Sequence, residues 1–234
     1  MTTLPKLNKN PIFVALDVPA ATAAVQLAQQ LHPHVGGFKI GLELFCAAGP
    51  QIVEEIGAEK VFLDLKFHDI PNTVAGAARS VARLGVMIFN VHCLGGVEMM
   101  RAGAMAAREV NAATKIIGVT ILTSHDAAQL QEIGLAEEPA VAARRLAQMA
   151  QQAGLDGVVC SPQEVASIRA ECGPDFLMVT PGVRPAGAAL GDQKRVMTPQ
   201  EALATGANWL VIGRPITAAP DPAQAARAIA QELV

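Results

Sequence analysis

The stretch DLKFHDIPNT, residues 64–73, decides the fold, because it joins a strand to a helix and carries charges at the junction. The apolar run VFL (61–63) before it is typical of a buried strand, and VAGAA (74–78) after it is typical of a helix. A charge buried without a partner is costly, so charged residues at the end of a core strand need a reason. On a strand, Asp64 and Lys66 point to the same face. In parallel α/β folds, this end of a strand is where chemistry is usually built.

Asp69 lies just past the expected end of this strand, where the chain can turn back toward Lys66. We therefore expect an alternating Asp–Lys–Asp cluster at the strand tip. Asp64 and Asp69 could instead chelate a divalent metal ion. The interleaved lysines oppose that alternative, because ammonium groups repel a cation and already neutralise the carboxylates. We expect no metal at this site.

The alternation of strand and helix extends along the whole chain. Short apolar runs predict eight strands, at residues 12–16, 37–40, 61–65, 86–91, 115–120, 157–160, 176–180 and 209–212. Helical patterns lie between and after them, at residues 20–31, 50–56, 73–84, 96–110, 139–153, 162–170, 198–204 and 221–233. Near-continuous apolar strands are typical of a parallel sheet covered on both faces. Eight β–α units in 234 residues predict a single α/β domain, a (β/α)8 TIM barrel over residues 1–234, with a doubly wound open sheet as the alternative.

The composition narrows the class of protein. The net charge is −3, aromatic residues make up 3% and tyrosine is absent, so we expect no nucleic-acid partner. No apolar run approaches the roughly 18 residues of a membrane span, and residues 1–10 carry no apolar leader, so we expect no membrane association. The four cysteines are scattered without metal-ligand spacing. They predict reduced, buried thiols in a cytoplasmic protein.

Charged residues also end two other predicted strands. Asp17 follows the first strand, where an Asp before a helix is also a common N-cap. Lys39 ends the second strand, where a lone lysine would usually be a solvated rim charge. Beside a third strand that ends in Asp64 and Lys66, both join one cluster of four charges. For His68 and His92 we expect hydrogen-bonded structural roles, because neither has a nucleophile near it in the sequence.

The last two strands are followed by features that suit an anion. Gly213 allows a backbone N–H to approach a phosphate, and Arg214 supplies a guanidinium for bidentate contact. Barrels often bind phosphate after strands seven and eight. Arg184 supplies a second cation. The polar segment 181–198, rich in Gly and Pro, is long for a compact domain and sits where a barrel could use a mobile lid.

Together these motifs resemble the orotidine 5'-phosphate decarboxylase family. The resemblance rests first on the specific ten-residue motif 64–73 and runs in order from about Pro11 to the C-terminus. It includes LD (16–17), FKIG (38–41), VTILTS (119–124), TPGVRP (180–185) and GRPI (213–216). The family implies a homodimeric barrel of the phosphate-binding type, which makes uridine 5'-monophosphate without a metal or cofactor.

The resemblance also implies a role for each matching residue. Lys66 would donate the proton to the pyrimidine carbon within a network of Lys39, Asp64 and Asp69. The partner subunit would donate Asp69, and Thr73 would reach the ribose of the neighbouring site. The remaining residues would bind the substrate: Asp17 and Lys39 at the ribose, Thr123 at the pyrimidine edge, and Arg184, Gln193, Gly213 and Arg214 at the phosphate.

Two alternatives remain open at this point. Sugar-phosphate enzymes on the same barrel, such as ketogulonate-phosphate decarboxylases and hexulose-phosphate synthases, resemble the chain in an Asp-x-Lys-x-x-Asp strand end, but they require magnesium. The continuation Ile70-Pro71-Asn72-Thr73 favours the pyrimidine enzyme. A catalytically silent barrel that senses a nucleotide is the alternative from another class. A mere binder has no need of a costly charge cluster.

Overall fold

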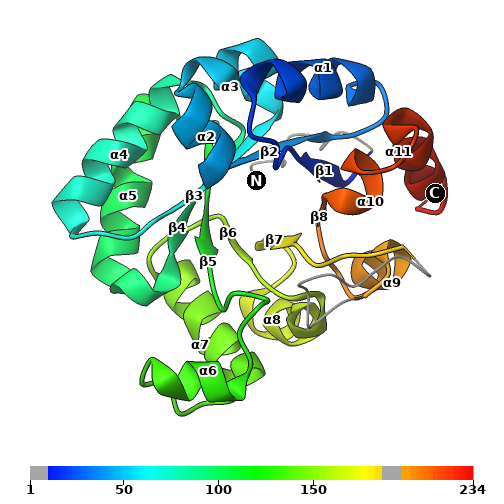
Figure 1. Ribbon diagram of the computed structural model, residues 1–234. Coiled ribbons are helices and arrows are strands. Elements are labelled where there is room, and N and C mark those ends of the chain that lie inside the picture. Colours follow the sequence, from blue (N-terminus) through cyan, green and yellow to red (C-terminus); the bar gives the residue numbers. More distant parts are fainter. Residues whose placement is uncertain (1–9, 186–196, 234) are drawn as a thin grey trace.

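The computed structural model describes residues 10–185 and 197–233, and eight parallel strands in them close into a barrel (Figure 1). Each strand pairs with the next in sequence order, and β8 returns to pair with β1. The closed barrel is confirmed over the open sheet. The strands are β1 Ile12–Ala15, β2 Gly37–Gly41, β3 Val61–Phe67, β4 Ile88–His92, β5 Lys115–Val119, β6 Gly157–Val159, β7 Leu177–Thr180 and β8 Trp209–Ile212.

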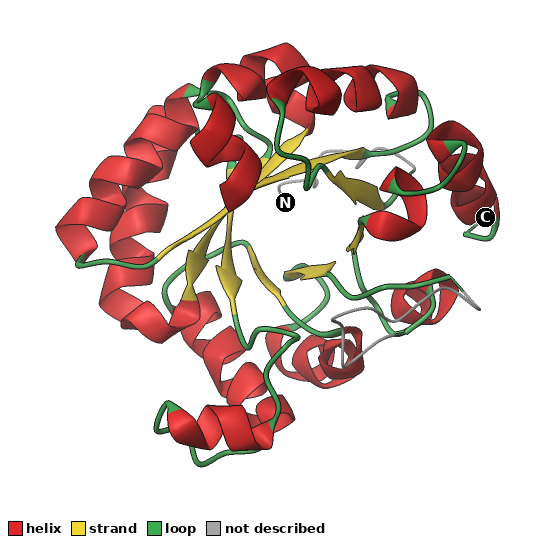
Figure 2. Cartoon of the chain, in the orientation of Figure 1, coloured by secondary structure: helices red, strands yellow, loops and turns green. Residues whose placement is uncertain are grey.

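Helices surround the barrel and cover the outer face of its strands (Figure 2). The predicted helices are all present to within a few residues, and the one at 162–170 begins with a short 3-10 turn, Pro162–Glu164. They are α1 Ala21–Leu31, α3 Gln51–Ile56, α4 Pro71–Arg83, α5 Gly96–Val110, α7 Pro139–Gln152, α8 Val165–Cys172, α9 Pro199–Ala204 and α11 Pro222–Gln231.

Three short helices were not expected from the sequence: α2 Leu42–Ala48, α6 Ala127–Glu132 and α10 Arg214–Thr217. They add to the regular β–α alternation and are too short for apolar periodicity to reveal them. Only α6 carries a clear local signal. Asp126 accepts a hydrogen bond from the backbone of Gln129, whose side chain accepts one in return, which is a capping box.

The barrel interior is filled by side chains, not open. Phe13 packs against Trp209 and Phe62, with ring centroids 4.4 Å and 5.9 Å apart. Ala15, Ile88, Ile117, Val179 and Val211 complete this inner cluster. A second, larger core lies between the strands and the helices. Each strand therefore buries both faces, which explains the near-continuous apolar runs. All eight carboxyl ends meet at one end of the barrel, above this packed floor.

The cysteines are free, and three of the four match the expectation of burial. Cys93, Cys160 and Cys172 are buried, whereas Cys46 on α2 is exposed, so the expectation was wrong for that residue. Its helix lies at the mouth of the barrel, and Leu44 is the one residue of this helix that is fully buried. Separately, none of the helices in the described residues has both the length and the apolar character needed to cross a bilayer.

Candidate active site

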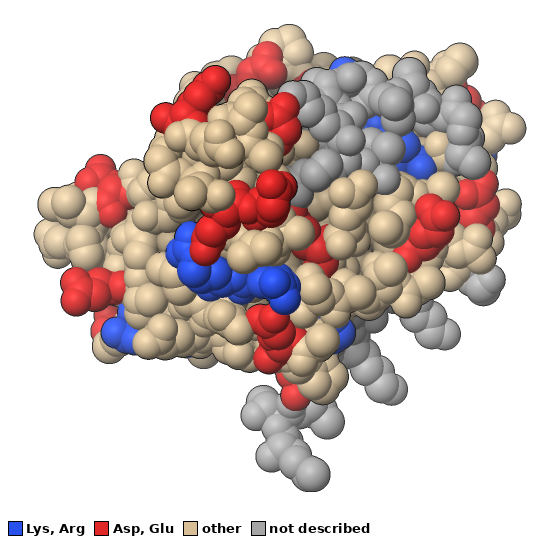
Figure 3. All heavy atoms as spheres, turned by 90° about the horizontal axis from the view of Figure 1, so that it is seen from below, with Lys and Arg blue, Asp and Glu red and all other residues tan. Residues whose placement is uncertain are grey.

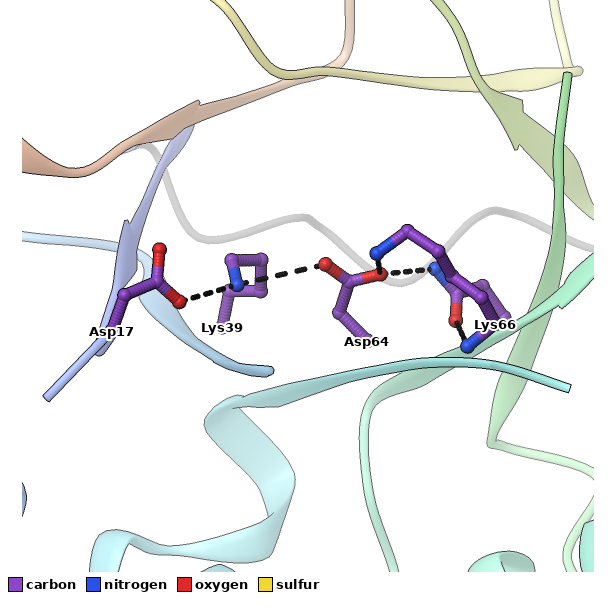
Figure 4. Close-up of polar contacts among 5 residues, drawn as sticks. Asp17, Lys39, Asp64 and Lys66 are labelled. Carbon is purple, nitrogen blue, oxygen red and sulfur yellow. Dashed lines mark hydrogen bonds and ion pairs between the residues drawn. The ribbon is translucent and has the colours of Figure 1, made fainter. Parts of the chain in front are cut away.

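Four charged side chains form a continuous chain of ion pairs across the mouth of the barrel (Figure 4). Lys39 Nζ lies 2.9 Å from Asp17 Oδ1 and 3.5 Å from Asp64 Oδ2. Lys66 Nζ lies 2.7 Å from Asp64 Oδ1. The ends of β1, β2 and β3 are neighbours in the barrel, so residues far apart in sequence meet here. The predicted meeting of Asp17, Lys39, Asp64 and Lys66 is present.

The route by which Lys66 reaches Asp64 differs from the expected one. The sequence predicts a regular strand that ends at residue 65, but β3 continues to Phe67. Its pairing with β4 is regular up to Leu63 and resumes at Phe67, so residues 64–66 form an irregular segment. Lys66 has φ +52°, and among the described residues no other non-glycine has a positive φ. Such a conformation costs about 1–2 kcal/mol for a residue with a side chain, and observed strain of this kind clusters at functional sites.

Asn90 on β4 fills the gap that this irregularity opens. Its Oδ1 accepts a hydrogen bond from the backbone N–H of Lys66 at 2.7 Å. Its Nδ2 donates to Asp64 Oδ1, also at 2.7 Å. The side chain is fully buried. Asn90 belongs to none of the motifs noted in the sequence. The signal that could have found it is an amide in the middle of the apolar strand IFNVH.

The carboxylate of Asp64 sits at the centre of the charge chain and remains ionised. Burial alone would raise its pKa, but Lys39 and Lys66 lie close by, and Lys66 and Asn90 donate hydrogen bonds to it. Together these contacts outweigh burial and hold the pKa of Asp64 below its ordinary value. The arrangement therefore holds an ionised carboxylate between two lysines in a sheltered place, where fixed charges act strongly.

Asp69 and Thr73 do not join this cluster within one chain. Both are exposed, beyond the end of β3 and in the first turn of α4. Asp69 Oδ1 accepts a hydrogen bond from the N–H of Ile70 at 2.6 Å, and in the described residues no ion pair joins Asp69 to Lys66. The expectation that the chain itself turns Asp69 back toward Lys66 is not met. The implied contribution across a dimer interface stays a prediction.

A hollow beside the charge chain has a charged side and an apolar side. Lys39, Asp64 and Lys66 line the charged side. Thr123 and its neighbour Ser124, both in the loop that follows β5, line another part of the wall. The apolar side is made by Phe62, Val119, Ile121, Val159, Pro181 and Val211. A flat ring with a charged substituent would meet both kinds of surface here.

A second hollow continues from the first and shares Lys39, Pro181 and Val211 with it. Asp17, Arg184, Gly213 and Arg214 line it, so three residues predicted to bind phosphate lie together. Arg184 is buried and donates a hydrogen bond to the carbonyl of Val183 at 3.0 Å. Gln193, the fourth predicted phosphate ligand, and most of the segment 181–198 lie outside the described residues.

His68 and His92 stack on each other near the charge chain, with ring centroids 5.4 Å apart. The imidazole of His92 accepts a weak hydrogen bond, at 3.4 Å, from the N–H of Leu94. Partial burial, with smaller contributions from His68, Lys66 and His125, lowers the pKa of His92 to about 4. The ring is therefore neutral at pH 7, which agrees with the structural role expected for it.

The lowered pKa of His92 predicts that stability declines with acidification. In the unfolded chain the imidazole takes a proton below about pH 6.5, whereas in the fold it stays neutral down to about pH 4. Stability is therefore lost as the pH falls from 6.5 toward 4. Denaturant unfolding between pH 7 and 4.5 should show a shallower pH dependence for His92→Gln than for the unmodified chain. Equal slopes would contradict this account, and His32→Gln, at the end of α1, is the control.

Some other charged side chains form ion pairs among the outer helices and loops. The guanidinium of Arg145 pairs with the carboxylate of Glu137, and Arg144 pairs with Glu171. On the face drawn in Figure 3, basic side chains lie directly beside acidic ones. The described residues contain no group of three or more His, Cys, Asp or Glu side chains arranged to hold a metal ion.

Comparisons with known proteins agree with this geometry. The family model described as "Orotidine 5'-phosphate decarboxylase / HUMPS family" matches residues 10–229. A relative from Halorhodospira halophila named orotidine 5'-phosphate decarboxylase is 59% identical over 95% of each chain. One of the same name from Moorella thermoacetica is 57% identical over 96% of this chain and 92% of its own. The crystal structure of orotidine 5'-phosphate decarboxylase from Lactobacillus acidophilus superposes with a TM-score of 0.82, at 38% identity over 96% of this chain and 99% of that one.

Proposed function

Because the chain belongs to the orotidine 5'-phosphate decarboxylase / HUMPS family, we propose that it is a carboxy-lyase that converts orotidine 5'-monophosphate to uridine 5'-monophosphate and CO2. This reaction is the final step of de novo pyrimidine nucleotide synthesis. The observation that carries the proposal is the pair of joined hollows. One presents Lys66 and Asp64 beside an apolar wall, and the other presents Arg184 and Arg214.

This decarboxylation requires a fixed positive charge more than it requires an electron sink. When the bond from the ring carbon to the carboxylate breaks, its electron pair stays on that carbon in the plane of the ring. The π-system delocalises this carbanion poorly, so a cation already in place is the effective stabiliser. The Lys66 ammonium supplies that charge and then gives its proton to the carbon. The resulting amine regains a proton from solvent.

The neighbours of Lys66 keep it ready for this step. Asp64 accepts its hydrogen bond at 2.7 Å, and this bond fixes the place of the ammonium group. Lys39 in turn balances the second oxygen of Asp64. Because these charges are already paired, little reorganisation is needed when negative charge develops on the substrate. We propose that the network needs neither a metal nor a cofactor.

Binding at the far end of the substrate supports the chemistry from a distance. In this proposal, Asp17 and Lys39 hold ribose hydroxyls and Thr123 contacts the pyrimidine edge. Arg184, Gly213 and Arg214, with Gln193, hold the phosphate. Guanidinium groups suit a phosphate because they offer paired donors. Energy from such remote contacts can be used to desolvate and align the reacting end, so it raises turnover as well as affinity.

We also propose that the working form is a homodimer in which each subunit completes its neighbour's site with Asp69 and Thr73. Support comes from the position of these residues. In the sequence they lie on either side of Ile70, which is 66% exposed. Leu42 and Leu94 are also exposed apolar residues, and they follow β2 and β4, the two strands that neighbour β3. An exposed apolar surface beside a charged cluster is typical of a contact between proteins. A cytoplasmic location remains a prediction.

A sugar-phosphate enzyme on the same barrel is the nearest alternative, because the matching family also includes the HUMPS branch. Substrate and metal dependence separate the two. We expect the purified protein to release CO2 from orotidine 5'-monophosphate in the presence of EDTA, and to leave 3-keto-L-gulonate 6-phosphate and hexulose 6-phosphate unchanged in magnesium. Turnover of either sugar phosphate that EDTA abolishes would overturn the proposal. Tight nucleotide binding without turnover would favour the silent sensor instead.

A further inference from the structure

We infer that Asn90 is a positioning residue that sets where the Lys66 ammonium lies. The amide touches both ends of the irregular segment of β3: it accepts from the backbone N–H of Lys66 and donates to the carboxylate of Asp64. Both contacts are 2.7 Å long, and the side chain is fully buried. No role for Asn90 follows from the substrate contacts proposed above.

The backbone geometry explains why a side chain is needed here. Residues 64–66 lie opposite a single residue of β4, so Lys66 has lost its regular backbone partner in the sheet. A buried N–H without an acceptor is disfavoured. The Oδ1 of Asn90 takes the place of the missing strand carbonyl and satisfies this N–H. This hydrogen bond thereby holds Lys66 at φ +52°, a backbone conformation that the Cβ of Lys66 disfavours.

The second hydrogen bond of Asn90 fixes Asp64, the ion-pair partner of Lys66. Asp64 Oδ1 accepts from Lys66 Nζ and from Asn90 Nδ2, so the amide orients the carboxylate that orients the ammonium. Only a group with one acceptor and one donor can make both bonds. Asn is the short side chain that carries the donor and the acceptor on two separate atoms without a charge. Because Asn90 sits behind Asp64, it acts through Asp64 and Lys66, and we assign it no contact with the substrate.

Two variants separate the contributions of the two hydrogen bonds of Asn90. Asn90→Ala removes both hydrogen bonds. Asn90→Asp keeps the shape and the acceptor for the Lys66 N–H, but places an oxygen opposite Asp64 where a donor stood. A misplacement of about 1 Å at a reacting group can cost roughly 10²-fold in rate. We expect kcat to fall by about that factor in both variants while KM changes by less than about threefold, since the substrate contacts are untouched.

The matched control is Asn208, which also ties two strands together with its amide. Its Oδ1 accepts from the N–H of Met178 and from Arg169, but at the amino ends of β7 and β8, away from the mouth. Asn208→Ala should lower the denaturant midpoint and leave kcat of the folded protein unchanged. If a folded Asn90 variant keeps kcat within about threefold of the unmodified chain, or if Asn208→Ala loses kcat equally, the positioning role is wrong.

The kinetic readout rests on the proposed function, so a second readout is independent of it. Hydrogen exchange of the Lys66 amide reports directly on its bond to Asn90. We expect a protected Lys66 amide in the unmodified chain, and protection lost in Asn90→Ala but retained in Asn90→Asp. Protection that survives Asn90→Ala would overturn the inference even if the chain decarboxylates nothing. Absence of turnover in the unmodified chain would count against the proposed function alone.

Discussion

Lys66→Ala should leave a folded protein with almost no decarboxylase activity. The substitution removes both the cation that faces the developing carbanion and the proton donor. Loss of a general acid typically costs 10²–10⁴-fold, and loss of one preorganised stabilising group about 10²–10³-fold. We therefore expect kcat to fall by at least roughly 10³-fold. Steady-state kinetics with orotidine 5'-monophosphate, together with circular dichroism for the fold, measure this.

Lys115→Ala is the matched control for this loss. Lys115 also pairs with an aspartate, Asp156, at 3.3 Å, and its side chain is 28% exposed against 32% for Lys66. It lies at the amino end of β5, the opposite end of the barrel from the mouth. Its removal should leave kcat unchanged. A Lys66→Ala protein that retains about a tenth of the unmodified rate would exclude Lys66 as the essential acid.

Asp69→Ala should be nearly inactive alone and should recover activity when mixed with Lys66→Ala protein. If Asp69 acts in the partner's site, a mixed dimer has one site with both defects and one site with none. Random exchange makes about half of the dimers mixed, so about one quarter of the unmodified activity should return. Mixing after mild denaturation and refolding, followed by the same kinetic assay, provides the measurement.

The outcome of this mixing distinguishes the two places where Asp69 could act. If Asp69 served only its own chain, every site in the mixture would carry one defect, and no activity would return. Full activity of Asp69→Ala alone would show that the residue is not needed at all. The exposed position of Asp69 and its bond to the N–H of Ile70 leave its second oxygen without a partner among the described residues, which suits a contact from outside.

The barrel was predictable because its determinants are local. Each strand buries both faces and therefore reads as a short apolar run, as in IFVA of β1 and WLVI of β8. The order of pairing then follows from the parallel β–α alternation. The short helices α2, α6 and α10 were missed because they have one or two turns and no full apolar stripe. They form in the segments that follow strands β2, β5 and β8.

The site was predictable as far as strand ends determine it. Asp17 lies two residues past β1, and Lys39 and Asp64 lie within β2 and β3, so the pairing of these three neighbouring strands brings them together. The conformation of Lys66 was not predictable, because it depends on Asn90, which is 24 residues away and on another strand. The failure of Asp69 to join the cluster has a similar origin. In our proposal its partner is the Lys66 of a second subunit, and a pattern in one sequence does not show where a second copy lies.

The most direct test of the central claim is the ultraviolet spectrum of orotidine 5'-monophosphate mixed with the purified protein, with and without EDTA. The account predicts conversion to the spectrum of uridine 5'-monophosphate at the same rate in both samples, because charged side chains alone stabilise the carbanion. An unchanged orotidine spectrum in both samples would contradict the assigned reaction. Conversion that EDTA abolishes would contradict a network of lysines and aspartates that works without a metal.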